Sequence, residues 1–222
     1  MPDMPDPTDS TTPANATYAA VPPLILASAS MTRKQMLDRA GLRFAIKPAD
    51  IAETDITHNM QQRGESHYSI VSMLSMKKAH HIAGQNPDAL VIGSDQILVH
   101  DNRILHKSPD RESAAQKLRN LMGKTHHLIS AVTVMRGDDV LWSHTESAAL
   151  TMRTLDDATL ESYLDRAGAG LMRSVGAYEL EGHGAWLFEK VDGDFFTILG
   201  MPLLPLLGFL GTDQLKGTGN EE

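Results

Sequence analysis

Cysteine is absent from the 222 residues of this chain. Its absence excludes a disulfide framework, a thiolate metal site and a cysteine nucleophile, and it fits a reducing, cytoplasmic location. Basic residues are also scarce, because 20 lysines and arginines stand against 28 aspartates and glutamates, for a formal net charge of −8. A protein that coats nucleic acid needs a broad basic surface, so we expect no nucleic-acid binding. Binding of free nucleotides is not excluded, because a few local cations suffice to bind their phosphates.

Long hydrophobic runs are missing too. The longest, residues 203–210, is interrupted by Pro205 and falls far short of the roughly 20 residues that span a bilayer. We expect a buried terminal helix there, and no membrane association. Residues 1–23 have neither the cationic start nor the apolar stretch of a secretory signal, and we expect them to form a disordered tail. A flexible tail is expected at 212–222, which leaves 24–211 as a single domain.

Three further signatures are absent. No GxxxxGK[ST] run follows a strand and no GxGxxG run opens a helix, which excludes P-loop kinases and dinucleotide-dependent dehydrogenases. The histidine pairs at 80–81 and 126–127 consist of adjacent residues, which point to different faces of a helix or strand. Neither pair therefore has the spacing of a chelating zinc site.

Apolar segments of strand length alternate with helical segments, which is typical of α/β proteins. Strands are expected at residues 24–27, 44–46, 89–99, 127–135, 140–152 and 186–190, with one more short strand after Gly193. Helices are expected at 33–39, 66–82, 110–121, from 156 or 157 to 166, and at 203–210, and the stretch before Glu65 is expected to be a polar connection. The turn at 137–139 indicates an antiparallel hairpin. We therefore expect a mixed central sheet flanked by helices, with two lobes around a cleft.

Two of the predicted strands end in polar turns of small residues. They are residues 24–33 (LILASASMTR) and residues 91–96 (VIGSDQ). Ligands of open α/β sheets gather at the carboxyl ends of strands, so the two turns can place hydroxyls, a cation and a carboxylate around one pocket. That combination suits a phosphorylated ligand with a metal.

The first of these turns carries Ser28, Ser30 and Arg33. A strand-to-helix junction offers backbone N–H groups and the positive end of the helix dipole to an anion, and arginine adds a planar fork for phosphate oxygens. The alternative is that Ser30 only caps the helix and Arg33 is solvated.

The second turn carries Asp95, a carboxylate at the end of a strand that is otherwise apolar. Such a group is costly to bury unless it is paired or binds a metal. With Mg²⁺ it would hold the cation and orient a water molecule for attack on the α-phosphorus. The alternative is an aspartate that caps a turn or helix.

Seven motifs occur in a fixed order along the chain: LASASxxR from Leu26, PADIAE from Pro48, KKA from Lys77, GSDQ from Gly93, LHK from Leu105, GKTH from Gly123 and GAYELEG from Gly176. This order resembles the Maf family, the septum-formation-inhibitor-like nucleoside triphosphate pyrophosphatases. The resemblance runs from about Leu24 to about Leu210. It implies the Maf or inosine-triphosphatase type of fold.

The resemblance also implies an activity and a set of site residues. The activity is hydrolysis of a non-standard nucleoside triphosphate to the monophosphate and pyrophosphate, with Mg²⁺ or Mn²⁺, in a homodimer, which keeps that nucleotide out of nucleic acids. Asp95 is implied as general base and, with Glu53, as a metal ligand. The implied phosphate-binding residues are Ser28, Ser30, Arg33, Lys78 and Lys107. Taken alone, Glu53, Lys78 and Lys107 would pass for solvated surface charges.

Three positions are associated with base choice in the resemblance, and here they are Thr32, Gln96 and Glu181. The pyrimidine-directed branch, which acts on dTTP and UTP, usually has Arg, Thr and Gln there. Gln96 and Glu181 look instead like the branch that acts on 7-methylguanosine triphosphate, although that branch has Trp in place of Thr32. A buried carboxylate at Glu181 would accept hydrogen bonds from a guanine edge and oppose the cationic charge of N7-methylation. The alternative is that both are structural loop groups.

Two other functions compete with this one. The family is also linked to arrest of septum formation, so a nucleotide-binding regulator of division without turnover is the main alternative. An enzyme of the same architecture that acts on deaminated purine triphosphates is the third. The SxSxxR start at Ser28 and the Glu181-Gly182 loop favour Maf over the third.

Overall fold

The computed structural model describes residues 22–211. The predicted tails at 1–23 and 212–222 therefore lie outside the described residues, apart from Pro22 and Pro23. In chain order the elements are β1 (Leu24–Leu26), α1 (Met31–Arg39), β2 (Ala45–Ile46), α2 (Glu53–Gln62), α3 (His67–Ala83), β3 (Leu90–His100), β4 (Arg103–Leu105), α4 (Arg111–Leu121), β5 (Thr125–Arg136), β6 (Asp139–Met152), α5 (Asp157–Ala167), α6 (Gly170–Arg173), the 3₁₀ helix η1 (His183–Leu187), β7 (Phe188–Asp192), α7 (Phe195–Leu199) and α8 (Leu203–Leu210).

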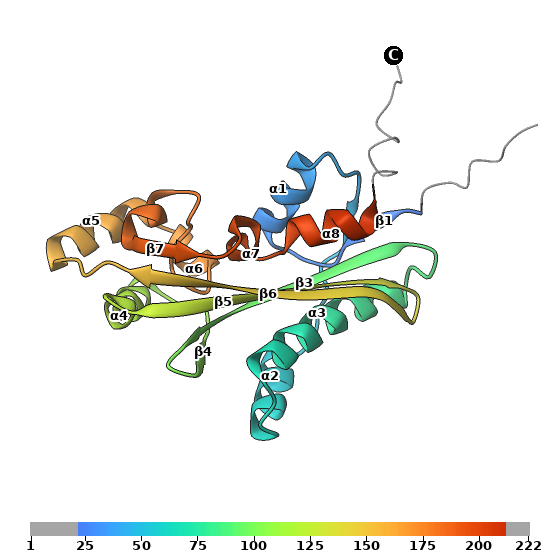
Figure 1. The fold of residues 1–222 in the computed structure, drawn as a ribbon, viewed down its shortest axis with the longest axis horizontal. Helices are drawn as coiled ribbons and strands as arrows, with labels where there is room; N and C mark the ends of the chain where they lie inside the picture. The colour runs from blue at the N-terminus through green and yellow to red at the C-terminus, as the bar shows by residue number, and fades with distance from the viewer. Residues whose placement is uncertain (1–21, 212–222) are drawn as a thin grey trace, which may run out of the picture.

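One sheet runs the length of the molecule (Figure 1). Its strand order is β2-β1-β3-β5-β6-β7, and β4 also pairs with β3. Strands β1, β2 and β3 pair in parallel, whereas β4, β5, β6 and β7 join the sheet through antiparallel pairs. The predictions of a mixed sheet and of a β5–β6 hairpin are confirmed.

The edge of β3 that faces β1 is only partly paired. β1 pairs with residues 90–92 and β4 pairs with residues 98–100. Between them, residues 93–97 have no strand partner on that edge among the described residues. The sheet therefore has a gap, and the polar residues 94–96 lie beside it.

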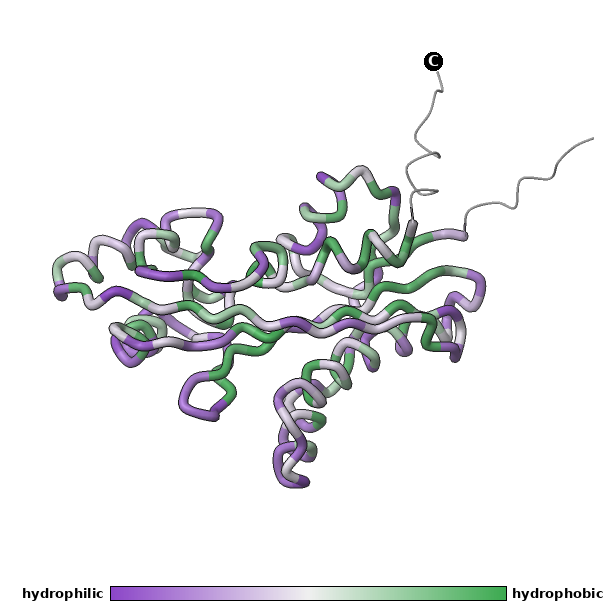
Figure 2. The backbone as a smooth tube through the Cα atoms, in the orientation of Figure 1, coloured by the Kyte–Doolittle hydropathy of each residue, from purple (hydrophilic) through white to green (hydrophobic). Residues whose placement is uncertain are grey.

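Helices cover both faces of the sheet around this gap (Figure 1). Helices α2 and α3 lie on one face, and α1, α7 and α8 lie on the other. Figure 2 shows hydrophobic segments where strands and helices meet, and hydrophilic segments along α2 and in the loops. A separate core cluster gathers α4, α5, α6 and η1 at the other end of the sheet. The predicted two lobes correspond to these two ends.

Gly93 sets how closely α3 approaches β3. A Cβ atom at this position would lie 2.1 Å from the carbonyl oxygen of Ser75 and 2.6 Å from the backbone nitrogen of Ala79. Only glycine permits this contact, because the clash would be with helix backbone. The close approach brings this same turn of α3, which carries Lys78, against β3.

The sequence predicted the wrong structure for two segments, the one before Glu65 and the one after Gly193. The polar connection before Glu65 contains helix α2, whose only buried residue is Thr57. Its face is too polar to give a clear helical period, and it is held by packing of Ile56 and Met60 on the α3 cluster. The predicted strand after Gly193 is helix α7, which Asp194 caps by accepting a 2.9 Å hydrogen bond from Thr197 N.

The C-terminal predictions need smaller corrections. Trp186 was expected in a strand, but it lies in η1 with 81% of its surface exposed, and β7 begins at Phe188. The terminal helix α8 is confirmed and buries Leu203 and Leu206, while Leu204 is exposed. Within residues 22–211, no helix combines the length and the apolar character needed to cross a membrane.

Candidate functional site

A cavity of about 950 Å³ opens at the gap in the sheet. Its wall is formed by the β1–α1 turn, α2, α3, the middle of β3, the loop after β4 and residues 172–181. All ten residues of the sequence-predicted site line it, from Ser28 near the start of the domain to Glu181 near its end. The volume suits a small-molecule ligand of nucleotide size.

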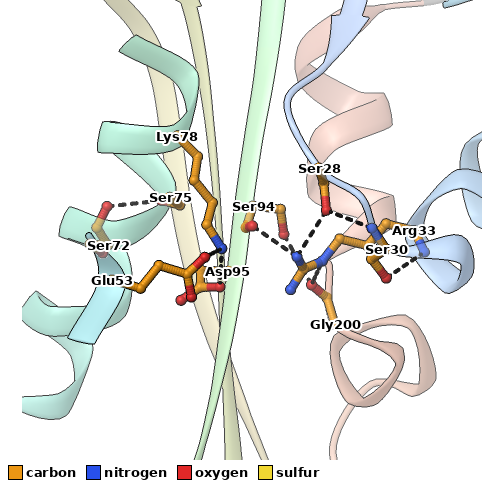
Figure 3. A network of polar contacts seen from close by, with 10 residues as sticks. All are labelled: Ser28, Ser30, Arg33, Glu53, Ser72, Ser75, Lys78, Ser94, Asp95 and Gly200. Atoms are coloured by element: carbon orange, nitrogen blue, oxygen red, sulfur yellow. Dashed lines mark hydrogen bonds and ion pairs between the residues drawn. The ribbon is translucent and has the colours of Figure 1, made fainter. Parts of the chain in front are cut away.

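On the α3 side of β3, one lysine binds two carboxylates (Figure 3). Lys78 Nζ lies 2.7 Å from Asp95 Oδ1 and 2.8 Å from Glu53 Oε1. Lys78 and Asp95 are buried, whereas half of the Glu53 side chain is exposed. One positive and two negative groups leave this cluster with a net charge of −1.

Asp95 lies in the middle of β3 and not at its end, so that detail of the prediction was wrong. The pocket nevertheless forms where the two turns were expected to meet. The reason is that β1 ends at Leu26, opposite Ile92, while β3 continues past it. The carboxyl end of β1 and the middle of β3 thus lie at the same edge.

On the opposite side of β3, Arg33 is buried with 8% of its surface exposed. Its Nε donates to Gly200 O at 2.9 Å, and its Nη1 donates to Ser94 O at 2.9 Å and to Ser28 Oγ at 3.3 Å (Figure 3). The alternative of a solvated arginine is excluded. Burial lowers the pKa of Arg33, and the negative charges of Asp95 and Glu53 act in the opposite direction.

Ser30 caps α1, as the alternative interpretation had it: its side chain accepts a 3.4 Å hydrogen bond from Arg33 N. Ser30 and Ser28 also line the cavity. Ser28 Oγ accepts from Ser30 N at 3.2 Å and from Arg33 Nη1, so its own hydroxyl proton is left to donate.

Gln96 is anchored by its amide nitrogen. Gln96 Nε2 lies 3.1 Å from Thr197 O, 2.9 Å from Ile198 O and 3.0 Å from Ser130 Oγ. These partners hold the C-terminal turn of α7 against β3. Because Nε2 is engaged, the carbonyl oxygen Oε1 is the atom that Gln96 can offer to a base in the cavity.

The other predicted specificity and phosphate residues lie at the rim. Thr32 is half-buried in the first turn of α1, and Lys107 is exposed in the loop after β4. The expectation of a buried Glu181 was wrong, because Glu181 is exposed while it lines the cavity. It follows the last buried residue of its loop, Tyr178, by three positions, and the intervening backbone carries it outward to solvent.

Sequence reasoning missed the supports of this site. Gly200 and Arg33 are 167 positions apart, and no local pattern could have paired them. His126 Nε2 lies 2.6 Å from Tyr178 Oη in the other lobe, where both are buried. Burial lowers the pKa of His126 to about 3 and raises that of Tyr178, so both are neutral near pH 7.

A family model described as Maf-like protein matches residues 23–212. The chain belongs to the Maf family. A 7-methyl-GTP pyrophosphatase of Rhizobium etli is 44% identical over 189 residues, which are 85% of this chain and 95% of that protein. Nucleoside triphosphate pyrophosphatases of Granulibacter bethesdensis and Paramagnetospirillum magneticum are 44% and 45% identical, over 86% and 84% of this chain and 97% and 96% of theirs. The closer resemblance to the branch named for 7-methyl-GTP is confirmed.

Proposed function

We propose that this Maf protein is a divalent-cation-dependent nucleoside triphosphate pyrophosphatase that acts on a guanine nucleotide methylated at N7. The observation that carries the proposal is the cavity itself: Lys78 with two carboxylates stands on one face of β3, and Arg33 stands on the other. The relatives match this chain over nearly their whole length, and their names, 7-methyl-GTP pyrophosphatase and nucleoside triphosphate pyrophosphatase, support the same chemistry. Hydrolysis of such a nucleotide keeps it out of nucleic acids.

The carboxylates of Glu53 and Asp95 fit a divalent cation. Both oxygens that bind Lys78 Nζ lie within 2.8 Å of that one atom, so the two carboxylates converge. Mg²⁺ in phosphoryl-transfer sites takes one or two carboxylates and completes its shell with water and phosphate oxygens. In the part of the chain that the structure describes, no group of three or more His, Cys, Asp or Glu side chains is placed to hold a metal ion, so the two carboxylates would be its side-chain ligands in this proposal. When bound, the cation would lower the pKa of a coordinated water and neutralise phosphate charge.

Asp95 serves as the general base in this proposal. Within the described chain, Lys78 engages only Oδ1 of Asp95, which leaves Oδ2 to accept a proton from water. The water oxygen attacks the α-phosphorus, the bond from that phosphorus to the bridging oxygen breaks, and pyrophosphate leaves. Lys78 is placed to neutralise the charge that builds on the leaving group.

Arg33 and Ser28 hold the phosphates from the other side. The Nε and Nη1 atoms of Arg33 donate to the protein, so among the described contacts Nη2 is the nitrogen left to donate to phosphate oxygens. The hydroxyl proton of Ser28 adds a second donor, and Ser30 and Lys107 line the remainder of the phosphate wall. A guanine edge would meet Gln96 Oε1 and the Glu181 carboxylate, with Thr32 close to the base.

Pyrophosphate release by the purified full-length chain tests the proposal. The substrates are 7-methyl-GTP, GTP, ITP, UTP, dTTP and CTP, each with Mg²⁺, with Mn²⁺ and with a chelator. Preference for 7-methyl-GTP and loss of turnover with chelator would support it. A pyrimidine preference would overturn the base assignment alone. Nucleotide binding without release from any substrate would overturn the activity and favour the binding regulator.

A further inference from the structure

Lys117 on α4 is a half-buried cation whose ammonium group is held by two main-chain carbonyls. Its Nζ donates to Val175 O at 2.9 Å and to His106 O. Among the described residues, no Asp or Glu oxygen lies within ion-pair distance of it. Burial lowers the pKa of Lys117 to about 8, because desolvation disfavours the charged ammonium group.

The two acceptors belong to different walls of the cavity. His106 lies in the loop after β4, next to the predicted phosphate residue Lys107. Val175 lies in the segment 172–181, which ends at the predicted base residue Glu181. The two segments are separated by more than 60 positions in the sequence, and Lys117 contacts both at once.

We call residues 172–181 the base wall and the loop after β4, which contains His106 and Lys107, the phosphate wall. Two other contacts hold the base wall without reaching the phosphate wall. Tyr163 Oη donates to Ala177 O at 3.0 Å, and Tyr178 Oη pairs with His126. These bonds tie residues 177 and 178 to α5 and β5 in the same lobe. Among residues 22–211, Lys117 is therefore the side chain whose hydrogen bonds link residue 175 to residue 106.

Packing alone does not explain a lysine at this place. An apolar side chain of similar length, such as methionine, would fill the same space without the cost of desolvating an ammonium group. What lysine adds is a set of charged N–H donors that two main-chain carbonyls can share.

We propose that Lys117 is a positioning residue that fixes the spacing between the phosphate wall and the base wall of the cavity. The inference rests on the proposed function for its kinetic consequence, but its structural consequence is independent of turnover. Lys117 is not among the residues that line the cavity. It acts through His106 and Val175.

Hydrogen exchange of the full-length protein without nucleotide tests the structural half. Lys117→Met is expected to speed amide exchange about fivefold or more in both residues 104–109 and residues 174–181, because both segments lose their shared anchor. Lys117→Arg, which retains charged donors, is expected to exchange like the original chain. Lys190→Met is the matched control, since Lys190 is an exposed lysine on β7. Unchanged exchange in either segment of Lys117→Met would overturn the proposal.

Kinetics test the other half on whichever nucleotide the original chain turns over fastest. Lys117→Met is expected to raise KM about tenfold and to leave kcat within about twofold, with rescue in Lys117→Arg. An equal loss of kcat/KM in Lys117→Met and Lys117→Arg, together with a lowered Tm, would show a packing role instead. If Lys117→Met does not fold, Lys117→Gln is judged by the same criteria. If the original chain releases no pyrophosphate, the proposed function fails, while the exchange result still decides the role of Lys117.

Discussion

The two faces of β3 bury polar groups in different ways. On the α3 face, charge meets charge: Lys78 binds Asp95 and Glu53. On the α7 face, the guanidinium of Arg33 meets neutral acceptors, which are two carbonyls and one hydroxyl. The Ser94 side chain donates to Gly200 O at 3.0 Å on the α7 face, and the next side chain, Asp95, points to the α3 face, because successive side chains of a strand alternate.

The difference leaves opposite charges on the two faces. The α3 cluster keeps one negative charge in excess, and the α7 cluster keeps the positive charge of Arg33. A cation with a polyphosphate is the ligand that complements both, since the metal meets the carboxylates and the phosphates meet the arginine. The carbonyl of Ser94, which the gap in the sheet leaves without a strand partner, is satisfied by Arg33, so the same arginine repairs the sheet edge and faces the ligand.

Asp95→Asn removes one carboxylate from the α3 cluster and has the largest expected effect. It removes the base and one negative charge while keeping the shape, so we expect kcat to fall about 1,000-fold or more, or about 4 kcal/mol, with nucleotide binding retained. Pyrophosphate release and titration calorimetry measure the two quantities. Asp138→Asn, at an exposed turn, is the control. Turnover near the original value would refute the assignment of Asp95.

Arg33→Lys removes the guanidinium hydrogen bonds on the α7 face while keeping the positive charge there. An ammonium group cannot reproduce the fork that spans Gly200, Ser94 and Ser28, so we expect a loss of about 3 kcal/mol in the free energy of unfolding and a raised KM. Urea denaturation and nucleotide titration check this. Arg39→Lys, exposed in the last turn of the same helix, should change neither. Equal stability of the two variants would mean that the contacts of Arg33 contribute little.

A third way of burying a polar group is found in the other lobe, where His126 pairs with the neutral hydroxyl of Tyr178. The pKa of His126 is about 3 in the folded protein and about 6.5 when unfolded, so the unfolded chain binds more protons between those values. Stability is therefore lost as pH falls from 6.5 toward 3, by about 2 kcal/mol at pH 5.

His126→Phe should remove that part of the pH dependence. Urea denaturation at pH 7 and pH 5 would show a smaller loss in this variant than in the original chain. His127→Phe, at the exposed neighbouring position, should retain the full loss. The same pH dependence in all three proteins would contradict a neutral, buried His126.

Glu181→Gln has the smallest expected effect, because Glu181 lies exposed at the rim, where water screens its charge. We expect the preference for 7-methyl-GTP over GTP to fall about fivefold, or about 1 kcal/mol, since only the methylated base is cationic. The ratio of kcat/KM values for the two nucleotides measures it. Glu189→Gln, exposed on β7, serves as control. An unchanged ratio would remove Glu181 from base recognition.

The sequence predicted most strands, the hairpin and the starts of the helices near residues 110 and 156, because these depend on local patterns. Asp110 and Asp156 each accept a 2.7 Å hydrogen bond from a backbone N–H three residues on, as helix caps do. It failed at α2 and α7. Both are short or largely polar, and tertiary packing decides their conformation more than the period of their residues does.

The site shows the same division. The chain by itself determined that polar groups interrupt β3 at residues 94–96 and that a cationic turn follows β1, since both are written in runs of a few residues. Only the tertiary structure decided that Lys78 pairs with Asp95, that Arg33 binds the Gly200 turn and that Lys117 joins two walls. The physical reason is that these contacts depend on where β1 stops and how closely α3 packs on Gly93, and both are properties of the assembled sheet.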